Sequence, residues 1–338
     1  DPIRILSWNN INPMYEASLG NRSTKGSKSI SNTTDIRWDI DKFFRLTANF
    51  NISVTDGDSE TYKSPESGTY IVNETEIEKR GALTLSNSKG VSWTGNFTGA
   101  YNKVTDNNSL LSLIAGMEIR KSKEEGSTLK TIGFYDDALD FVGQAVGYPT
   151  DESPIGTQDI NTELGFFANA NYMFRNRYYA DFVYRLSGSS KFGANQRYGQ
   201  FWSGGLGWNL HNESFFQSDK IDLLKLRGSV GYTGKVNFAP YQAMTIYKYS
   251  NELEYKNGIG AVPQTIGNDD LKWEREFSYN IGADISLWSR RFNATLDFYL
   301  KRTKDLVLNA NKAPSTGITT AMFNIGEMEN KGFEFSVD

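Results

Sequence analysis

Alternation of apolar and polar residues over segments of about ten residues is the feature that most constrains how this chain can fold. Between Leu164 and Phe174, every second residue is apolar, and Gly165, Asn169 and Asn171 lie among the residues between them. A period of two places alternate side chains on opposite faces of an extended strand. The segment is therefore predicted to be a β-strand with one apolar face.

The same pattern recurs in roughly a dozen segments of the sequence. The clearest further examples cover residues 44–52, 93–101, 111–119, 178–187, 201–210, 224–232, 277–287 and 292–301. Strands with one apolar and one polar face can cross a membrane only as a closed sheet, because the backbone has no other hydrogen-bond partners in lipid. The sequence thus predicts an all-β fold, a transmembrane antiparallel β-barrel.

Composition excludes several other classes of protein. No window approaches the run of about 20 apolar residues that a membrane-spanning helix needs. The 36 basic and 40 acidic residues contain no dense basic block, so a nucleic-acid partner is not expected. The chain has no cysteine and a single histidine, His211, which is expected to lie in a turn. We therefore expect no enzyme activity.

Connections of two lengths alternate along the chain. Short turns are predicted near Asp41, at 175–177 and at 289–290, whereas long links lie around 56–76, 125–160, 237–272 and 305–322. Short turns are typical of the periplasmic rim of a bacterial barrel, and long loops of its extracellular rim. In one long loop, Phe134 to Val146 has the apolar spacing of a short amphipathic helix.

Both ends of the sequence bear on domain organisation. The final residues alternate Phe333, Phe335 and Val337 with polar neighbours up to Asp338, so the chain stops within a strand. The first ten residues do not have the pattern of a secretory signal. We therefore expect residues 1–338 to be one barrel segment of a longer protein whose final strands are absent.

Several runs of sequence resemble the SusC/RagA family of TonB-dependent outer-membrane transporters. They are SSKFGANQRYGQFWSGGLGWNL with the turn HNESFF directly after it, LKLRGSVGYTGKVNFAPY, NDDLKWE, FYLKRTKDLVL and APSTGITTAMFNIGEMENKGFEF, which lie between Ser189 and Phe335. The resemblance implies a barrel of about 22 strands, the size class whose lumen holds a plug. It also implies an N-terminal plug and TonB-binding segment, both absent here, a SusD-like surface lipoprotein as a lid, and a multi-pass location in a Bacteroidota-type outer membrane.

Charged residues at polar strand positions are predicted to line the lumen. They are Asp181, Arg185, Lys225, Arg227, Asp284, Asp297 and Lys301. These groups could form a substrate path, but a large lumen must be polar whatever it carries. We favour a structural interpretation, in which they pair with one another or with the plug.

Aromatic residues of the long loops are the candidates for substrate binding. They are Tyr241, Tyr247, Tyr249, Tyr255 and Trp273. An aromatic ring can stack on the C–H groups of a sugar or pack against peptide side chains. The alternative is a place in the aromatic girdle at the membrane interface, which suits Trp273 at the start of a strand.

Acidic residues of one loop are candidates for a structural calcium site. Asp136, Asp137 and Asp140, together with Asp151 and Glu152, offer the oxygen ligands that calcium prefers. Their spacing does not match an EF-hand, and a solvated loop surface is the alternative. No other metal or cofactor is expected.

The leading hypothesis for function is TonB-dependent import of an oligomeric nutrient, a glycan or a peptide, with a SusD-like lid. The alternatives are a TonB-dependent receptor for a metal chelate or vitamin, and a structural or adhesive barrel that transports nothing.

Overall fold

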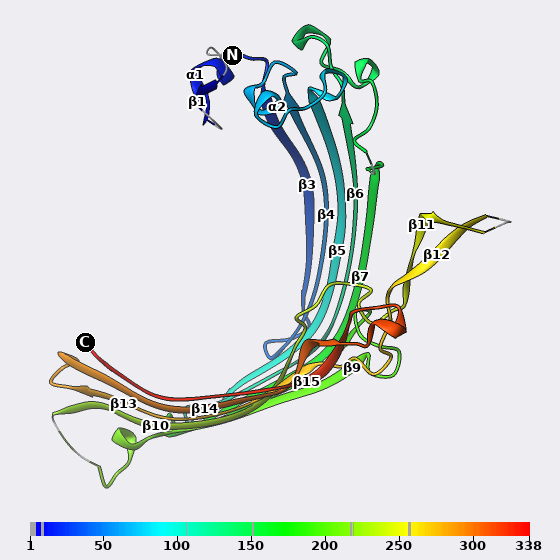
Figure 1. The fold of residues 1–338 in the computed structure, drawn as a ribbon. Helices are drawn as coiled ribbons and strands as arrows, with labels where there is room; N and C mark the ends of the chain where they lie inside the picture. Colours follow the sequence, from blue (N-terminus) through cyan, green and yellow to red (C-terminus); the bar gives the residue numbers. More distant parts are fainter. Residues whose placement is uncertain are drawn as a thin grey trace. The chain divides into compact units, whose positions relative to one another are not determined.

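The computed structural model describes residues 5–7, 10–105, 107–150, 152–216, 218, 220–255 and 258–338. Long strands dominate it (Figure 1). The strands are β1 (Ile5–Ser7), β2 (Asn10–Ile11), β3 (Arg22–Asp39), β4 (Phe44–Lys63), β5 (Ala82–Thr105), β6 (Ser109–Ile132), β7 (Ile155–Phe174), β8 (Tyr178–Ser189), β9 (Tyr198–Asn209), β10 (Ile221–Lys235), β11 (Ile246–Tyr255), β12 (Gly258–Thr265), β13 (Glu274–Leu287), β14 (Phe292–Asn311) and β15 (Thr320–Val337).

Helical segments are short and lie in the connections. They are α1 (Pro13–Glu16), α2 (Gly68–Val72) and the 3₁₀ turns η1 (Ile77–Lys79), η2 (Asp137–Leu139), η3 (Val142–Gln144), η4 (Leu210–Asn212) and η5 (Pro314–Thr316). Within the described ranges, no helix has the length and apolarity needed to cross a bilayer.

One large sheet contains most of the strands. Over the described residues it has eleven strands in the order β15-β14-β13-β10-β9-β8-β7-β6-β5-β4-β3, so its two edges are β15 and β3. Strands β10 and β13 pair directly, and the intervening β11 and β12 form a separate antiparallel hairpin (Figure 1). From β7 to β15, neighbouring strands of this sheet pair in antiparallel fashion. The predicted all-β, antiparallel barrel-type fold is confirmed.

The register separates apolar and polar side chains onto opposite faces. Leu206 of β9, Gly228 of β10, Ile281 of β13 and Phe298 of β14 lie directly opposite one another in one row. Residues that are opposite in neighbouring antiparallel strands project to the same face. The exposed fractions of Leu206 and Ile281 are 71% and 69%. This face, which we call the apolar face, therefore presents large apolar side chains outward, as contact with lipid requires.

Two small cores lie at strand ends and in the connections. Contacts divide the chain into one compact unit of residues Asp1–Thr33, Asn51–Trp93 and Ser122–Ile160, and a second of Thr34–Phe50, Thr94–Lys121 and Asn161–Asp338. The core of the first unit contains Tyr62, Leu83 and Phe134. The core of the second contains Phe192, Phe238, Ala243 and Leu271, with Trp273 packed against it.

A carboxylate ties several strand ends together at the short-turn end of the second unit. Glu213, 7% exposed, accepts hydrogen bonds from the Tyr178 hydroxyl at 2.6 Å and the Trp208 indole at 3.0 Å. Arg177, in the turn between β7 and β8, lies 3.3 Å from the same carboxylate. These hydrogen bonds, first from Tyr178 and then from Trp208, together with the charge of Arg177, hold the pKa of Glu213 below its usual value.

Two predictions about the connections were wrong in detail. Strands β4, β6 and β14 continue to Lys63, Ile132 and Asn311, so the long loops are shorter than the sequence indicated. The predicted amphipathic helix from Phe134 to Val146 is replaced by η2 and η3. Phe134 instead packs edge-on against Tyr62, with ring centroids 5.4 Å apart, so its apolar character belongs to a loop core.

A charge on the apolar face should oppose insertion into lipid. We expect Ile281→Arg to lower the free energy of unfolding of the full-length protein in phospholipid vesicles by about 2–4 kcal/mol. The matched control is Ser229→Arg, because Ser229 lies beside Asn280 on the opposite face. It should cost less than about 0.5 kcal/mol. Urea titration followed by tryptophan fluorescence measures both, and equal losses would contradict the assignment of the two faces.

Removing the charge of Glu213 should change the pH dependence of stability. A lowered pKa in the folded state means that the ionised group stabilises the fold above its unfolded pKa, and that this contribution disappears as pH falls through the folded pKa. We expect Glu213→Gln to be less stable than wild type at neutral pH, and the difference to close as pH falls below the usual range of a glutamate. Denaturant midpoints across this acid range measure the difference, and a gap independent of pH would contradict the prediction.

Candidate functional site

The polar face of the sheet gathers the charged residues that the sequence singled out. The register places Arg227 opposite Gly282, and Gly282 opposite Asp297. Lys225 likewise lies opposite Asp284. Asp181 pairs with Gly205, Arg185 with Phe201, and Lys301 with Ser278, at polar positions of the same sheet. All seven predicted residues thus project to one face, whereas their location in a lumen stays a prediction.

Arg227 is the centre of a charge cluster on this face that contains two carboxylates. Its Nη2 lies 2.6 Å from Asp297 Oδ2, and its Nε lies 3.3 Å from Asp284 Oδ2. The guanidinium reaches Asp297 by passing over Gly282, where a Cβ would lie 2.7 Å from Arg227 Cζ. A glycine at position 282 therefore permits the ion pair across three strands.

The other predicted charges have different partners. Arg185 pairs at 3.3 Å with Glu118, a residue of β6 that the sequence interpretation did not include. The two-residue alternation could have predicted that Glu118 belongs to the polar face, because it lies between the apolar residues Met117 and Ile119 of the predicted strand 111–119. The ammonium groups of Lys225 and Lys301 lie 5.2 and 5.6 Å from tyrosine ring centroids, those of Tyr179 and Tyr299.

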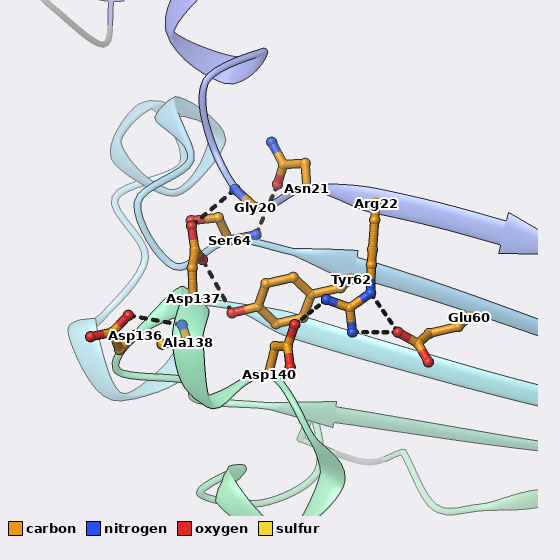
Figure 2. A network of polar contacts seen from close by, with 10 residues as sticks. All are labelled: Gly20, Asn21, Arg22, Glu60, Tyr62, Ser64, Asp136, Asp137, Ala138 and Asp140. Carbon is orange, nitrogen blue, oxygen red and sulfur yellow. Dashed lines mark hydrogen bonds and ion pairs between the residues drawn. The ribbon is translucent and has the colours of Figure 1, made fainter.

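Figure 2 shows a second polar network, in the loops of the first unit. Asp137 accepts hydrogen bonds from the backbone N–H of Gly20 at 3.0 Å and the hydroxyl of Tyr62 at 3.2 Å. Arg22 pairs with both Glu60 and Asp140. The network therefore joins the segment before β3 to the end of β4 and to η2.

The same contacts bear on the predicted calcium site. Asp136 accepts a hydrogen bond from the backbone of Ala138 at 2.9 Å, while Asp137 and Asp140 face the partners just described (Figure 2). Glu152 pairs with Lys130 at 2.9 Å. The described residues contain no cluster of three or more potential metal ligands. Asp151 lies outside the described residues, and calcium binding that includes it stays a prediction.

The five candidate aromatic residues occupy different environments. Tyr247 and Tyr249 lie two residues apart on β11 and are 65% and 76% exposed. Tyr241, in the loop after β10, adopts a positive φ of 65°. The side chain of Tyr255 lies outside the described part of the structure. Trp273 packs against Phe192 at a centroid distance of 4.3 Å, so its ring belongs to a loop core.

His211 and Glu213 lie close together in the chain, but the sequence predicted the location of His211 and missed the contacts of Glu213. His211 Nδ1 lies 3.3 Å from the backbone nitrogen of Leu224, consistent with the predicted place in a turn. Glu213 joins residues of separate hairpins, and no local motif in the sequence marks those partners.

Comparison with known proteins gives matches along almost the whole chain. Residues 5–338 match the model of the family described as TonB dependent receptor-like, beta-barrel. The TonB-dependent receptor P39 of Formosa agariphila is 33% identical over 239 residues, which cover 70% of this chain and 23% of that protein. The TonB-dependent receptor SusC of Bacteroides thetaiotaomicron is 35% identical over 187 residues, covering 53% of this chain and 18% of SusC.

A structural comparison agrees with these sequence matches. The structure of the RagAB peptide importer in a closed-closed state superposes with a TM-score of 0.85 and 23% identity, covering 97% of this chain and 35% of that one. The structural similarity supports the assignment of the fold. The chain spans about a quarter of the length of P39. The SusC/RagA resemblance seen in the sequence is thereby confirmed. The chain belongs to the TonB-dependent receptor-like β-barrel family.

Proposed function

We propose that this chain is part of a transporter that imports an oligomeric nutrient, a glycan or a peptide, across a bacterial outer membrane in a TonB-dependent manner. The observation that carries the proposal is the family match over residues 5–338. Similarity to SusC and to the RagAB peptide importer favours an oligomeric cargo. The strands with one apolar and one polar face supply the wall that such a transporter needs.

Two partners follow from the proposed activity. A SusD-like lipoprotein would cover the extracellular mouth, and TonB would act on a plug from the periplasmic side. Structural similarity to the RagAB peptide importer supports the presence of a second protein in the proposed transporter. We place the chain in the outer membrane of a Bacteroidota-type cell, in line with its Formosa and Bacteroides relatives.

The proposed cycle involves a conformational change and no bond chemistry. Substrate would bind between the barrel loops, the plug and the lid, and remodelling of the plug would release it inward. Tyr247 and Tyr249 are the best-exposed candidates to contact substrate, because their rings are open to solvent on β11. Tyr241, Tyr255 and Trp273 complete the proposed set.

Uptake by a deletion strain tests the proposed function directly. We expect loss of the gene to abolish growth on at least one glycan or peptide, and uptake of the labelled oligomer to fall to background. Complementation with the wild-type gene should restore both, while growth on the corresponding monomers should be unchanged. Dependence of a metal chelate or vitamin on the gene, with normal growth on all oligomers, would replace this proposal with the alternative receptor function.

A pair of variants separates a structural role of the charges from a role in the substrate path. Arg227→Met removes the donor that holds Asp297, so we expect it to cost about 1.5–3 kcal/mol of stability. Lys301→Met is the control, because the ammonium group of Lys301 lies over the ring of Tyr299, and it should cost about 0.5 kcal/mol. Both variants should retain the wild-type KM for uptake. A raised KM with unchanged stability would assign Arg227 to the path.

A further inference from the structure

The apolar face of the sheet contains a hollow near its short-turn end. Gly228 of β10 lies between Leu206 of β9 and Ile281 of β13 in one row, and it contributes no side chain. Its two neighbours project outward as walls. The backbones of β9 and β13 are about 10 Å apart, because each pair of neighbouring strands is about 4.8 Å apart. The resulting hollow has a volume of about 470 Å³.

Aromatic rings form the wall of this hollow on the short-turn side. Tyr172, Phe174, Tyr178 and Trp208 follow one another with ring centroids 6.4, 6.5 and 6.3 Å apart. Tyr172, Tyr178 and Trp208 line the hollow itself. Rings with polar tips mark the boundary between hydrocarbon and headgroups in membrane proteins. The hollow therefore has an apolar end on the sheet and a polar end at the turn.

A cation lies at the polar end. The guanidinium carbon of Arg175, an exposed residue, is 5.0 Å from the ring centroid of Phe174. Among the described residues, the ion pairs include none formed by Arg175, whereas nearby Arg177 is paired with Glu213. The order along this face is thus a positive charge, a band of aromatic rings and an apolar hollow.

We propose that this hollow binds one acyl chain of an anionic phospholipid whose phosphate group contacts Arg175. In one leaflet of a bilayer, the phosphate lies at the surface and the acyl chain lies deeper. Arg175 and the apolar hollow lie in the same order along this face. The inference requires membrane insertion of the sheet but is independent of the transported substrate. A second copy of this chain would have no need of a cation beside the aromatic rings, so we favour the lipid.

Filling the hollow tests the proposal. A Cβ at Gly228 would meet only the backbone oxygen of Asn280, at 3.8 Å, so the sheet can accept a larger residue there. Full-length protein in detergent is titrated with dioleoyl phosphatidylglycerol, and native mass spectrometry counts the bound lipids. We expect Gly228→Leu to weaken the tightest site about tenfold, equivalent to roughly two methylene groups losing burial.

The matched control places the same side chain elsewhere on the apolar face. A Cβ at Gly99 would lie 3.5 Å from Leu46 Cδ2, an ordinary contact, and Gly99 does not line the hollow. Gly99→Leu should leave lipid affinity unchanged. Equal lipid affinity in wild type and Gly228→Leu would overturn the proposal, as would a protein dimer that Gly228→Leu abolishes while lipid binding persists.

A second variant tests the headgroup contact without altering the sheet. Arg175→Gln should weaken phosphatidylglycerol binding about fivefold, the usual effect of one cation near an anionic lipid surface. Arg290→Gln, in the turn between β13 and β14, is the control and should have no effect. Dioleoylglycerol, which lacks the phosphate, should bind equally to wild type and Arg175→Gln. An unchanged affinity of Arg175→Gln for phosphatidylglycerol would reject the headgroup contact.

Discussion

The need to satisfy backbone hydrogen bonds away from water governs this structure. In hydrocarbon, an unpaired N–H or C=O group costs several kcal/mol, so membrane strands must pair along their length. Apart from register shifts near Leu223 and Leu306, the antiparallel pairing from β7 to β15 meets that need inside the described part of the sheet. The same ladder fixes which side chains share a face, and so a two-residue periodicity determines both where lipid contacts the sheet and where charges can gather.

The strands could be predicted from sequence because their signal is local. Phe277 to Leu287 and Phe292 to Lys301 alternate as expected, and both lie in observed strands. The ends of β4 and β6 were missed because their outer parts are polar on both faces, which removes the alternation. The end of β14 was missed because the pairing register shifts between Lys304 and Val307, which breaks the two-residue period there. The segment from Phe134 to Val146 was misinterpreted because the buried side of Phe134 is defined by Tyr62, which lies far away in sequence.

The sequence predicted which charged residues lie on the polar face, but not which of them form ion pairs with one another. Polar strand positions identified Arg227, Asp284 and Asp297, and the structure brings these three together. Which carboxylate contacts Arg185 depends on the pairing of β6 with β7 and of β7 with β8, and no single segment of the sequence determines those registers. The sequence also could not predict which aromatic residues are exposed. Tyr247 and Tyr249 of β11 are exposed and Trp273 is packed against Phe192, and this difference depends on contacts that are distant in sequence.

The carboxylate of Glu213 has a mechanical consequence. Tyr178 begins β8, Trp208 lies near the end of β9, and Arg177 belongs to the turn before β8, yet all three contact one side chain. A load applied to any one of these hairpin ends is shared with the others through that group. If force enters from the periplasmic side, as the proposed import requires, these hairpin ends resist it together as one rigid unit. Deformation is then concentrated in the plug, which the proposed cycle requires to change conformation.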